Sequence, residues 1–324
     1  MTSVCPSPRV VVVVVTFNRA GLLLQTLEGL KCLSHRPERV VLVDNASSDG
    51  TPHRLLEKGW LGDLPPSGEG GLWRWVGEVD GRLAGMPLAM TYLRKATNDG
   101  GAGGFAAGIR EAMKQECEWL WLMDDDVVPE PDSLGRLLAD AGSEPRRVVQ
   151  QRRVYADGTD VELQATELNL TNPFRELKQG AAHFHGDDSV VRTRTFTFEG
   201  LLLPRRLVDE VGLPDTSFFL FADDTDYAIR AKRAGFEIVV SARSRIVKQL
   251  RQAGAVEYTE RHYYYFRNLY RLDLRYGSPA VRLLRPTLLL LRRLLGCVRR
   301  RDPRRSFGIV LRSYRDAWRL ERGR

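Results

Sequence analysis

The 324-residue sequence contains little cysteine and no long apolar run. Its four cysteines are widely separated, which argues against a disulfide framework or a CxxC zinc site and favours a reducing compartment. No window approaches the ~18 consecutive apolar residues of a membrane-spanning helix, because arginines and a proline interrupt residues 283–298. The N-terminal residues also lack the apolar stretch of a secretory signal. We therefore expect a cytoplasmic protein that does not span a membrane.

Acidic residues are scarce at one end of the chain only. The whole sequence carries a net charge of +8, which by itself suggests binding to nucleic acid. Residues 282–324, however, contain 14 arginines and three acidic residues, a net charge of +11, whereas the other 281 residues contain 35 basic and 38 acidic side chains, a net charge of −3. The excess positive charge belongs to the C-terminal segment, and we do not expect nucleic acid as a partner.

The first 250 residues alternate strand and helix patterns. Residues 10–15 are six consecutive valines, as expected for a parallel strand covered on both faces, and apolar residues at helical spacing follow at 19–33. Further strands are predicted at 39–43, 90–93, 119–123, 147–154 and 236–240, and a helix at about 106–116. This order predicts an α/β fold with a doubly wound, mainly parallel sheet, in which ligands bind beyond the carboxyl ends of the strands.

Other segments have a different character. Residues 59–89 and 157–195 show no clear period; we interpret the first as a surface loop or irregular hairpin, and we expect the second to fold over the site. Beyond residue 253 the pattern is helical. We therefore divide the chain into a domain of residues 1–250 and a helical extension of residues 251–324.

Three consecutive carboxylates, Asp124, Asp125 and Asp126, follow the strand predicted at 119–123. A cation relieves the repulsion among such groups, and carboxylate oxygens suit Mg²⁺ or Mn²⁺. Because alternate residues of an extended segment point the same way, we expect Asp124 and Asp126 to face one site while Asp125 turns aside. The alternative is an acidic turn without a ligand.

A glycine-rich segment precedes the helix predicted at 106–116. Asn98 is followed by Gly100, Gly101, Gly103 and Gly104. Glycine lets the backbone approach a ligand closely, and a helix N-terminus favours anions. The segment is not a Walker loop, because no Gly-Lys-Ser/Thr follows. The alternative is a tight connection between a strand and a helix.

A second acidic cluster, Asp223, Asp224 and Asp226, opens a predicted helix. The helix dipole stabilises the ionised carboxylates, but capping explains only one of the three. A carboxylate beside a substrate hydroxyl can act as a general base. The two acidic clusters together suggest a metal site for a diphosphate leaving group and a base for an incoming hydroxyl.

These motifs resemble those of the family 2 inverting glycosyltransferases, and within them the galactofuranosyltransferase and rhamnosyltransferase branch. The matching segments are 16–19, 43–47, 98–105, 124–126, 198–200 and 218–227, with Arg230. The resemblance covers roughly residues 9–250. It implies a GT-A fold, a nucleotide-diphosphate sugar donor and a Mg²⁺ or Mn²⁺ ion.

The resemblance also implies roles for individual residues. Asp124 and Asp126 match the metal-binding DxD pair, and Asp224 matches the general base, with Asp223 beside it in the catalytic site. The donor-binding residues that it implies are Thr16, Asn18, Arg19, Asp44, Asn98, Gly100, Gly101, Gly103, Gly104, Asp125 and Lys248. The implied acceptor-binding residues are Glu199 and Asp226.

One position departs from the family pattern. Many relatives place a histidine, a further metal ligand, after the strand that follows the base-bearing helix, whereas this sequence has Lys248 and Gln249. Either the metal is held by the aspartates, phosphates and water alone, or Lys248 supplies positive charge directly to the diphosphate.

The sequence as a whole predicts an inverting glycosyltransferase. We expect it to transfer galactofuranose, with rhamnose as the next choice, from a nucleotide-diphosphate donor to a hydroxyl of a glycan or lipid-linked acceptor. The missing histidine motivates an alternative, a non-catalytic nucleotide-sugar binding or scaffolding protein on a membrane surface.

Residues 282–324 alternate leucines with arginine clusters. A helix of this kind can lie in a membrane interface and attract anionic lipid, which predicts a peripheral protein at the inner face of the cell membrane. A helical hairpin packed on the protein, or an oligomer interface, is the alternative. We expect deletion of this segment to abolish vesicle binding and largely to retain donor hydrolysis. The aromatic run 263–268 is interpreted as packing the C-terminal helices onto the body.

Overall fold

The computed structural model describes residues 8–66, 71–79, 87–162, 164–180, 184, 186, 190–251 and 257–323. Its strands are β1 (Val10–Thr16), β2 (Arg39–Asp44), β3 (Trp73–Val79), β4 (Leu88–Arg94), β5 (Trp119–Asp124), β6 (Val127–Pro129), β7 (Arg147–Tyr155), β8 (Thr166–Leu168), β9 (Lys178–Gly180), β10 (Val190–Arg192), β11 (Leu201–Pro204) and β12 (Glu237–Lys248). Its helices are α1 (Ala20–Lys31), α2 (Thr51–Glu57), α3 (Gly100–Ala112), α4 (Ser133–Ala141), α5 (Arg205–Val211), the 3-10 turn η1 (Thr216–Phe218), α6 (Asp223–Arg233), α7 (Glu260–Tyr276), α8 (Pro279–Cys297) and α9 (Pro303–Arg322).

The main sheet has the strand order β10-β12-β7-β11-β5-β1-β2-β4-β3, and β6 pairs with β12. Strands β5, β1, β2 and β4 are mutually parallel, as are β7 and β12. Strand β11 runs antiparallel between β5 and β7, and β3 forms an antiparallel hairpin with β4. The predicted α/β fold with a mainly parallel sheet is confirmed, and the irregular segment 59–89 contributes the hairpin strand β3.

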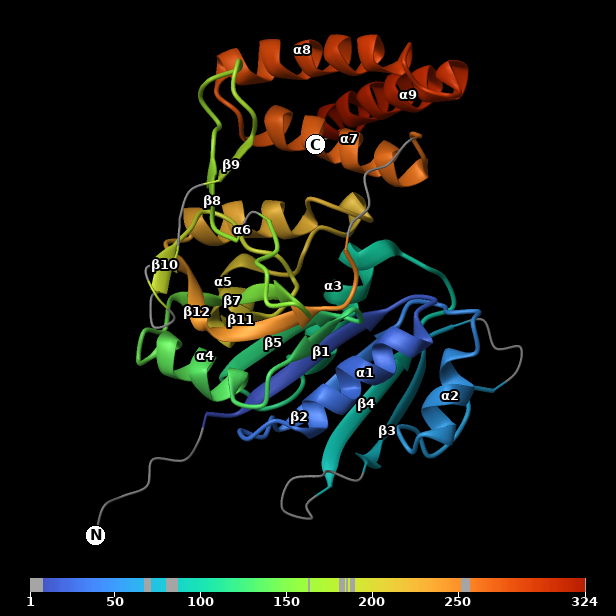
Figure 1. Ribbon diagram of the computed structural model, residues 1–324, viewed down its shortest axis with the longest axis vertical. Coiled ribbons are helices and arrows are strands. Elements are labelled where there is room, and N and C mark those ends of the chain that lie inside the picture. Colours follow the sequence, from blue (N-terminus) through green and yellow to red (C-terminus); the bar gives the residue numbers. More distant parts are fainter. Residues whose placement is uncertain are drawn as a thin grey trace.

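The valine run of β1 is buried on both sides, as its composition predicts. Val10, Val12 and Val14 pack with apolar residues of α1, α2 and α4, whereas Val11 and Val13 pack with α3, α5 and α6. Successive side chains of a strand point to opposite faces, so the unbroken run supplies both layers of the core. Helices therefore cover the sheet on both faces (Figure 1).

Two predicted elements have the wrong bounds. The helix predicted at 106–116 begins at Gly100 and ends at Ala112, because the glycines form its first turns instead of a preceding loop. The strand predicted at 236–240 continues to Lys248, past an irregularity in its register between Ser241 and Arg245. The added length has a hydrogen-bonded partner on each side, since β7 and β6 both pair with it. It brings Lys248 to the edge of the sheet where β5 ends.

The C-terminal helices α7, α8 and α9 pack together at one end of the molecule, and α6 lies between them and the sheet (Figure 1). Their shared core includes Phe266 and Tyr270 of α7, Cys297 of α8 and Val310 of α9. A separate apolar cluster, which includes Phe218 and residues of α3, α6 and α7, joins them to the body. None of the helices in the described ranges is both long and apolar enough to cross a membrane.

Candidate active site

Three carboxylates meet at the edge of the sheet where β5 ends. Asp124 is the last residue of β5, and Asp126 lies in the turn before β6. Glu199 lies just before β11, which runs antiparallel beside β5. One carboxylate oxygen from each of these residues lies within 4.8 Å of the others. We call Asp124, Asp126 and Glu199 the acidic triad; the structure thus places Glu199, predicted to bind the acceptor, beside the predicted metal-binding pair.

Cationic side chains contact the acidic triad. The ammonium of Lys248 donates a hydrogen bond to Oε1 of Glu199, and Arg153 donates to Oε2 of the same carboxylate at 2.9 Å. Burial acts against ionisation of Glu199, but Arg153 and Lys248 outweigh it and hold the pKa of Glu199 below its ordinary value. Arg19 donates to Oδ2 of Asp126 at 3.1 Å. These contacts offset part of the negative charge and fix the orientation of Glu199.

The charges of the two aspartates of the triad are not fully compensated by the side chains around them. Burial, followed by the charges of Asp126 and Glu199, raises the pKa of Asp124 well above its ordinary value. Oδ1 of Asp126 is buried and has no hydrogen-bond partner within the described ranges. A divalent cation relieves both conditions, because it offsets the repulsion and coordinates the free oxygen. The residues present therefore fit a divalent metal ion, with Glu199 as a third carboxylate ligand.

Asp125 contacts the end of β1. Its Oδ2 accepts hydrogen bonds from the hydroxyl of Thr16 at 2.7 Å and the backbone N–H of Phe17 at 3.3 Å, and its Oδ1 accepts from Arg19 at 3.2 Å. Thr16, Arg19 and Asp125 thus hold the ends of β1 and β5 together. Donor binding by these three residues stays a prediction; of the three, the half-buried Arg19 is the most exposed.

Asp44, at the end of β2, is fully buried. Its carboxylate accepts hydrogen bonds from the Tyr92 hydroxyl at 2.6 Å, the Arg94 guanidinium at 2.7 Å and the backbone N–H of Ser47 at 2.7 Å. These partners account for the burial of a charged group. Arg94, which the sequence did not single out, is the more accessible member of this group. Contact between Asp44 and a nucleotide stays a prediction.

Asn18 and Asn98 shape turns at the same edge of the sheet. Oδ1 of Asn18 accepts a hydrogen bond from the backbone N–H of Ser48 at 2.6 Å, and Oδ1 of Asn98 accepts from the backbone N–H of Gly100 at 2.8 Å. Both side chains therefore have a structural role in this conformation. Their predicted contacts with a donor are additional to it and stay predictions.

The predicted donor-binding glycines differ in what the fold requires of them. Gly100 has a φ of +73°, and a Cβ there would collide with the carbonyl oxygen of Phe219. A Cβ on Gly104 would lie 2.5 Å from Cγ1 of Val15. A Cβ on Gly101 would meet nothing within 4 Å. Packing therefore explains Gly100 and Gly104, whereas Gly101 borders open space. Gly103 resembles the first two, since a Cβ there would press on the side chain of the preceding turn.

Asp223 and Asp224 open α6 after a segment of unusual backbone. Phe219, Phe221 and Ala222 have φ angles of 64°, 67° and 63°, a region that residues other than glycine rarely adopt. Burial, followed by the charge of Asp224, raises the pKa of Asp223 to about 8. Asp223 is therefore protonated at neutral pH and can donate a hydrogen bond beside the half-buried Asp224.

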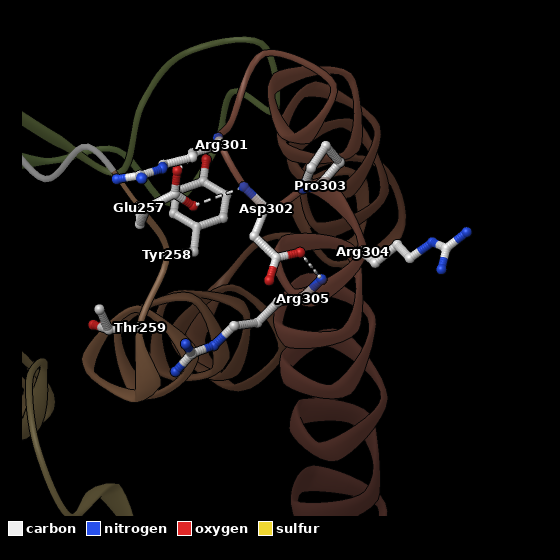
Figure 2. Close-up of a pocket in the computed structure, with 8 residues that line it drawn as sticks. All are labelled: Glu257, Tyr258, Thr259, Arg301, Asp302, Pro303, Arg304 and Arg305. Carbon is white, nitrogen blue, oxygen red and sulfur yellow. Dashed lines mark hydrogen bonds between the residues drawn. The ribbon is translucent and has the colours of Figure 1, made fainter.

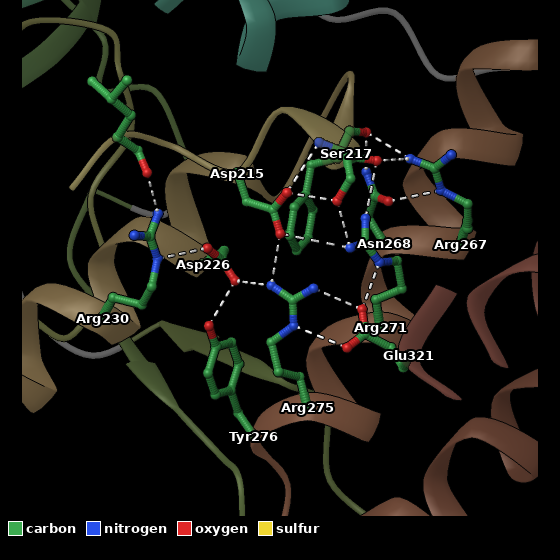
Figure 3. Close-up of polar contacts among 12 residues, drawn as sticks. Asp215, Ser217, Asp226, Arg230, Arg267, Asn268, Arg271, Arg275, Tyr276 and Glu321 are labelled. Carbon is green, nitrogen blue, oxygen red and sulfur yellow. Dashed lines mark hydrogen bonds and ion pairs between the residues drawn. The ribbon is translucent and has the colours of Figure 1, made fainter. Parts of the chain in front are cut away.

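Asp226 points toward the C-terminal helices. It is fully buried, and its carboxylate accepts hydrogen bonds from Tyr276 at 2.6 Å, from Arg275 at 2.7 Å and from Arg230 at 3.0 Å (Figure 3). The aromatic run 263–268 lies on α7 at the same junction, and its interpretation as a packing element agrees with the ring contacts of Tyr264 with Phe219 and of Tyr265 with Phe221. Asp226 thus joins α6 to α7, and acceptor binding by this residue stays an untested prediction.

A pocket of about 650 Å³ lies between the starts of α7 and α9 (Figure 2). Arg301, Arg304 and Arg305 line it together with the acidic Glu257 and Asp302. The described residues that line it include none of the predicted site residues. The pocket therefore belongs to the C-terminal helices and is separate from the acidic triad.

Two features of the site had weak or no sequence signals. Arg153 is one of many arginines, and only the pairing of β7 with β11 and β12 brings it to Glu199. The resemblance singled out Glu199 for acceptor binding, and the signal for its place beside the aspartates is the glycine that follows it: Gly200 has a φ of +82°, and a Cβ there would lie 2.5 Å from Oε1 of Gln151. A glycine required by the backbone indicates a tight turn, and this turn presents Glu199 at the sheet edge.

Comparison with known proteins agrees with this geometry. Residues 83–269 match a family model described as "Glycosyltransferase like family 2", and residues 11–58 match one described as "Glycosyl transferase family 2". The galactofuranosyltransferase GlfT1 of Mycolicibacterium smegmatis (strain ATCC 700084 / mc(2)155) is 29% identical over 228 residues. The similarity covers 69% of this chain and 65% of that protein, so the chain spans slightly less than two thirds of its relative.

Solved structures with similar folds include two bound to nucleotides and Mn²⁺. GalNAc-T7 with UDP, GalNAc and Mn²⁺ superposes with a TM-score of 0.59 at 13% identity, over 82% of this chain and 47% of that one. The mannosyltransferase PcManGT from Pyrobaculum calidifontis, with GDP-Man and Mn²⁺, has a TM-score of 0.55 at 17% identity, over 94% of this chain and 74% of that one. These similarities concern the fold alone, and they agree with the expected GT-A architecture.

Proposed function

This chain belongs to glycosyltransferase family 2, and on that premise we propose that it transfers a sugar from a nucleotide-diphosphate donor to a hydroxyl of a glycan or lipid-linked acceptor, with inversion. The acidic triad is the observation that carries the proposal, because it fits a divalent metal at the carboxyl edge of the sheet. Asp224, at the start of α6, supplies the carboxylate for base catalysis. No serine or cysteine nucleophile is required for a single direct displacement.

The proposed mechanism assigns separate tasks to the two acidic clusters. Asp124, Asp126 and Glu199 would hold Mg²⁺ or Mn²⁺, which when bound supplies positive charge for the departing diphosphate. Asp224 accepts the proton of the acceptor hydroxyl as that oxygen attacks the anomeric carbon. Asp223, protonated at neutral pH, donates a hydrogen bond that orients the acceptor or the sugar. Binding of the donor and of the acceptor holds the acceptor oxygen in line with the anomeric carbon and the departing diphosphate.

Lys248 has two alternative roles in this mechanism. It pairs with Glu199 and is buried, and the carboxylates around it raise its pKa above its ordinary value despite that burial. When a metal binds, Lys248 either stays on Glu199 or turns its ammonium to the diphosphate. In both cases it adds positive charge beside the leaving group. Arg19, which contacts Asp126, adds further positive charge to the site.

The sugar is proposed from the relatives. The mycobacterial relative is a galactofuranosyltransferase by name, which favours galactofuranose and leaves rhamnose as the second choice. Because the chain covers only 65% of that protein, the donor and acceptor are proposals for this chain. The predicted cytoplasmic location forms part of the same proposal.

Turnover of a nucleotide-sugar panel tests the function. Purified protein with Mg²⁺ or Mn²⁺ is expected to consume UDP-galactofuranose or, failing that, dTDP-rhamnose, and Asp224→Asn is expected to abolish transfer. Asp209→Asn, which changes an exposed carboxylate on α5, is the matched control. Absence of any turnover that depends on Asp224 would reject the proposal. Donor binding that persists in a chelator, with Asp124→Ala and Asp224→Asn silent in cells, would instead favour a non-catalytic binding or scaffolding protein.

The C-terminal helices carry a second proposal, association with an anionic membrane surface. On α8, Leu284, Leu288, Leu291 and Leu295 are between 40 and 74% exposed, and Val298 just beyond it is 66% exposed. Their alternating spacing of four and three residues places them along one face of the helix. An exposed apolar stripe of this length indicates an interaction surface.

Charge favours lipid over a second copy of the chain as the partner of this stripe. Arg292 and Arg299 border it and are exposed, and α8 contains no acidic residue. Two copies packed through the same stripe would bring these arginines together, whereas anionic headgroups complement them. Arg304 and Arg305, at the start of α9, are exposed as well.

A further inference from the structure

The segment that precedes the proposed general base holds a backbone conformation that its own residues disfavour. Residues 219–222 include three non-glycine residues with positive φ, at Phe219, Phe221 and Ala222. Such conformations persist only when surrounding contacts determine them, and they cluster at functional sites. We call residues 216–222 the base loop, because Asp223 and Asp224 follow it directly. The structure identifies the contacts that fix it.

Asn268 of α7 makes the central contact with the base loop. Its side-chain amide nitrogen lies 2.8 Å from each of three backbone carbonyl oxygens, those of Phe218, Leu220 and Phe221. Its Oδ1 accepts a hydrogen bond from Nε of Arg267 at 3.0 Å, which fixes the orientation of the amide. Asn268 is completely buried. The two N–H groups of one side chain are therefore shared among three carbonyl groups in the stretch where the backbone turns into the left-handed region.

Arginines of α7 extend the same clamp. Arg267 donates to the carbonyl oxygens of Ser217 and Phe218 at 3.0 and 2.7 Å, and Arg271 donates to that of Ser217 at 3.0 Å. Neither arginine is free to follow the loop if it moves, since both are buried in α7. The base loop is thus held by side chains of a helix that begins 36 residues after Asp224 in the sequence.

Arg275 carries the contact from α6 to the last helix. Its guanidinium donates to Asp226 at 2.7 Å and to Asp215 at 3.0 Å, and it also donates to Glu321 of α9 at 2.7 and 3.0 Å (Figure 3). Arg271 shares Glu321 at 2.8 Å. Burial acts against the ionisation of Glu321, but Arg275 and Arg271 outweigh it and hold its pKa below the ordinary value. α9 thereby anchors the side chain that fixes the first turn of α6.

On the opposite side, the base loop packs on the start of α3. The backbone N–H of Ala102 donates to the carbonyl oxygen of Phe219 at 3.2 Å, and Gly100 leaves room for that same oxygen. The base loop therefore lies between the glycine-rich turn and the C-terminal helices. Its conformation fixes the place of the carboxylates that follow it relative to the carboxyl edge of the sheet.

We propose that Asn268 and the Arg275–Glu321 pair are positioning residues for the general base: they hold the base loop and the first turn of α6 so that Asp224 reaches the acceptor hydroxyl. This inference rests on the proposed function and adds to it that the C-terminal helices set the rate of transfer. The residues act through Asp224 and touch neither substrate nor metal.

The test uses the full-length protein and three variants. Asn268→Asp keeps the size of the side chain but replaces the donor with an oxygen that repels the three carbonyl groups. Glu321→Gln weakens the anchor of Arg275 from a site remote from the base. Val310→Ala is the control, because it creates a cavity in the core of the C-terminal helices and Val310 belongs to no contact of the base loop. Thermal unfolding measures the stability of each variant, so that the losses can be compared.

Steady-state transfer is measured at a temperature at which every variant is folded. Asn268→Asp is expected to lower kcat by about 10²-fold, the cost of misplacing a reacting group by about 1 Å, with a donor KM that changes by less than about threefold. Glu321→Gln is expected to lower kcat in the same direction and less. Val310→Ala is expected to keep kcat although its stability falls. Equal loss of kcat in Val310→Ala and Asn268→Asp at equal loss of stability overturns the inference.

Hydrogen exchange separates failure of this inference from failure of the proposed function. Amide exchange of residues 216–226 is expected to be faster in Asn268→Asp and Glu321→Gln than in Val310→Ala. If the unsubstituted protein transfers no sugar, the proposed function fails, and this comparison still tests the clamp. Equal exchange rates in all three variants overturn the clamp whether or not transfer is observed.

Discussion

Asp126 and Glu199 come from different parts of the sequence, yet carboxylate oxygens of the two lie within 4.8 Å of each other, and Oδ1 of Asp126 has no hydrogen-bond partner within the described ranges. Glu199 already has Lys248 and Arg153 as partners, which allows it to stay ionised beside the two aspartates. Asp126 thus offers an oxygen without a hydrogen-bond partner, and Glu199 places an ionised carboxylate beside it. This arrangement is the basis of the first prediction.

Removing Lys248 is expected to strengthen metal binding, and removing Glu199 to weaken it. Lys248→Gln takes a positive charge away from the acidic triad, so the affinity for Mn²⁺ rises; Glu199→Gln removes a ligand, so it falls by about tenfold or more. Electron paramagnetic resonance of free Mn²⁺, titrated without a donor, measures both. If the two variants bind Mn²⁺ as the unsubstituted protein does, Glu199 is not a ligand.

Asp223 is expected to make stability depend on pH. Burial and the charge of Asp224 raise its pKa to about 8 from an ordinary value of 3.8, so between these values the folded protein binds a proton that the unfolded chain has released. The contribution of Asp223 to the free energy of unfolding therefore falls as pH rises from about 4 to 8. Asp223→Asn mimics the protonated group, so its gain in Tm over the unsubstituted protein is expected to be larger at pH 8 than at pH 5.

The control for this measurement is Asp209→Asn, which removes an exposed carboxylate of α5. It is expected to shift Tm by a similar, small amount at both pH values. A gain for Asp223→Asn that is the same at pH 5 and pH 8 contradicts the protonated state assigned to Asp223.

Two glycines of α3 are expected to respond oppositely to alanine. The Cβ added by Gly101→Ala has no neighbour within 4 Å, and alanine has the higher helix propensity. The free energy of unfolding is therefore expected to rise by about 0.5–1 kcal/mol. Gly104→Ala places a Cβ 2.5 Å from Val15, and stability is expected to fall by about 1–3 kcal/mol. Thermal unfolding measures both changes.

Donor titration of Gly101→Ala then tests the predicted donor site. A methyl group in the open space beside Gly101 is expected to weaken nucleotide-sugar binding although the fold is intact. Unchanged donor affinity in this stable variant means that no part of the donor approaches Gly101.

The exposed stripe of α8 is expected to bind anionic vesicles. Leu291 and Leu295 are 53 and 74% exposed, so a double change to glutamine leaves the fold intact and removes apolar area from the interface. Cosedimentation with phosphatidylglycerol vesicles is expected to be lost in this variant and reduced by salt in the unsubstituted protein. Leu311→Gln, at a leucine of α9 that is 51% exposed, is the control. A dimer in solution that the double variant dissociates, without vesicle binding, would identify a second copy as the partner.

Deletion of residues 282–324 is expected to do more than remove a membrane contact. It takes away Glu321, which pairs with the buried Arg271 and with Arg275, and it uncovers Phe266 and Tyr270. Buried charges that lose one of their partners are destabilised. We therefore expect lower Tm and slower transfer, in place of the retained activity expected from the sequence. A truncated protein with unchanged Tm and kcat contradicts both this expectation and the clamp.

The sequence by itself determined the fold class, a mainly parallel sheet covered by helices, and the polar edge of that sheet. Six valines in a row require burial on both faces, and helical spacing between such strands requires crossovers, which together give a parallel sheet. The two acidic clusters, residues 124–126 and 223–226, were recognised because one stands at the end of a strand and the other at the start of a helix, and the family resemblance gave Asp224 the role of the base. Local order and chain polarity are sufficient for inferences of this kind.

Only the tertiary structure decided which side chains meet. Glu199 reaches Asp126 because β11 inserts antiparallel between β5 and β7. Lys248 reaches Glu199 because β12 continues beyond its apolar residues. Asp226 faces away from Asp224 because two residues of an α-helix turn the direction of a side chain by about 200°, and the carboxylate of Asp226 accepts a hydrogen bond from Arg275 of α7. These contacts depend on strand order and helix packing over long sequence separations, which no local pattern encodes. The same holds for the C-terminal segment. Its arginines indicated a charged surface, but the sequence did not indicate that Glu321 pairs with Arg271 and Arg275 of α7, the helix that holds the base loop.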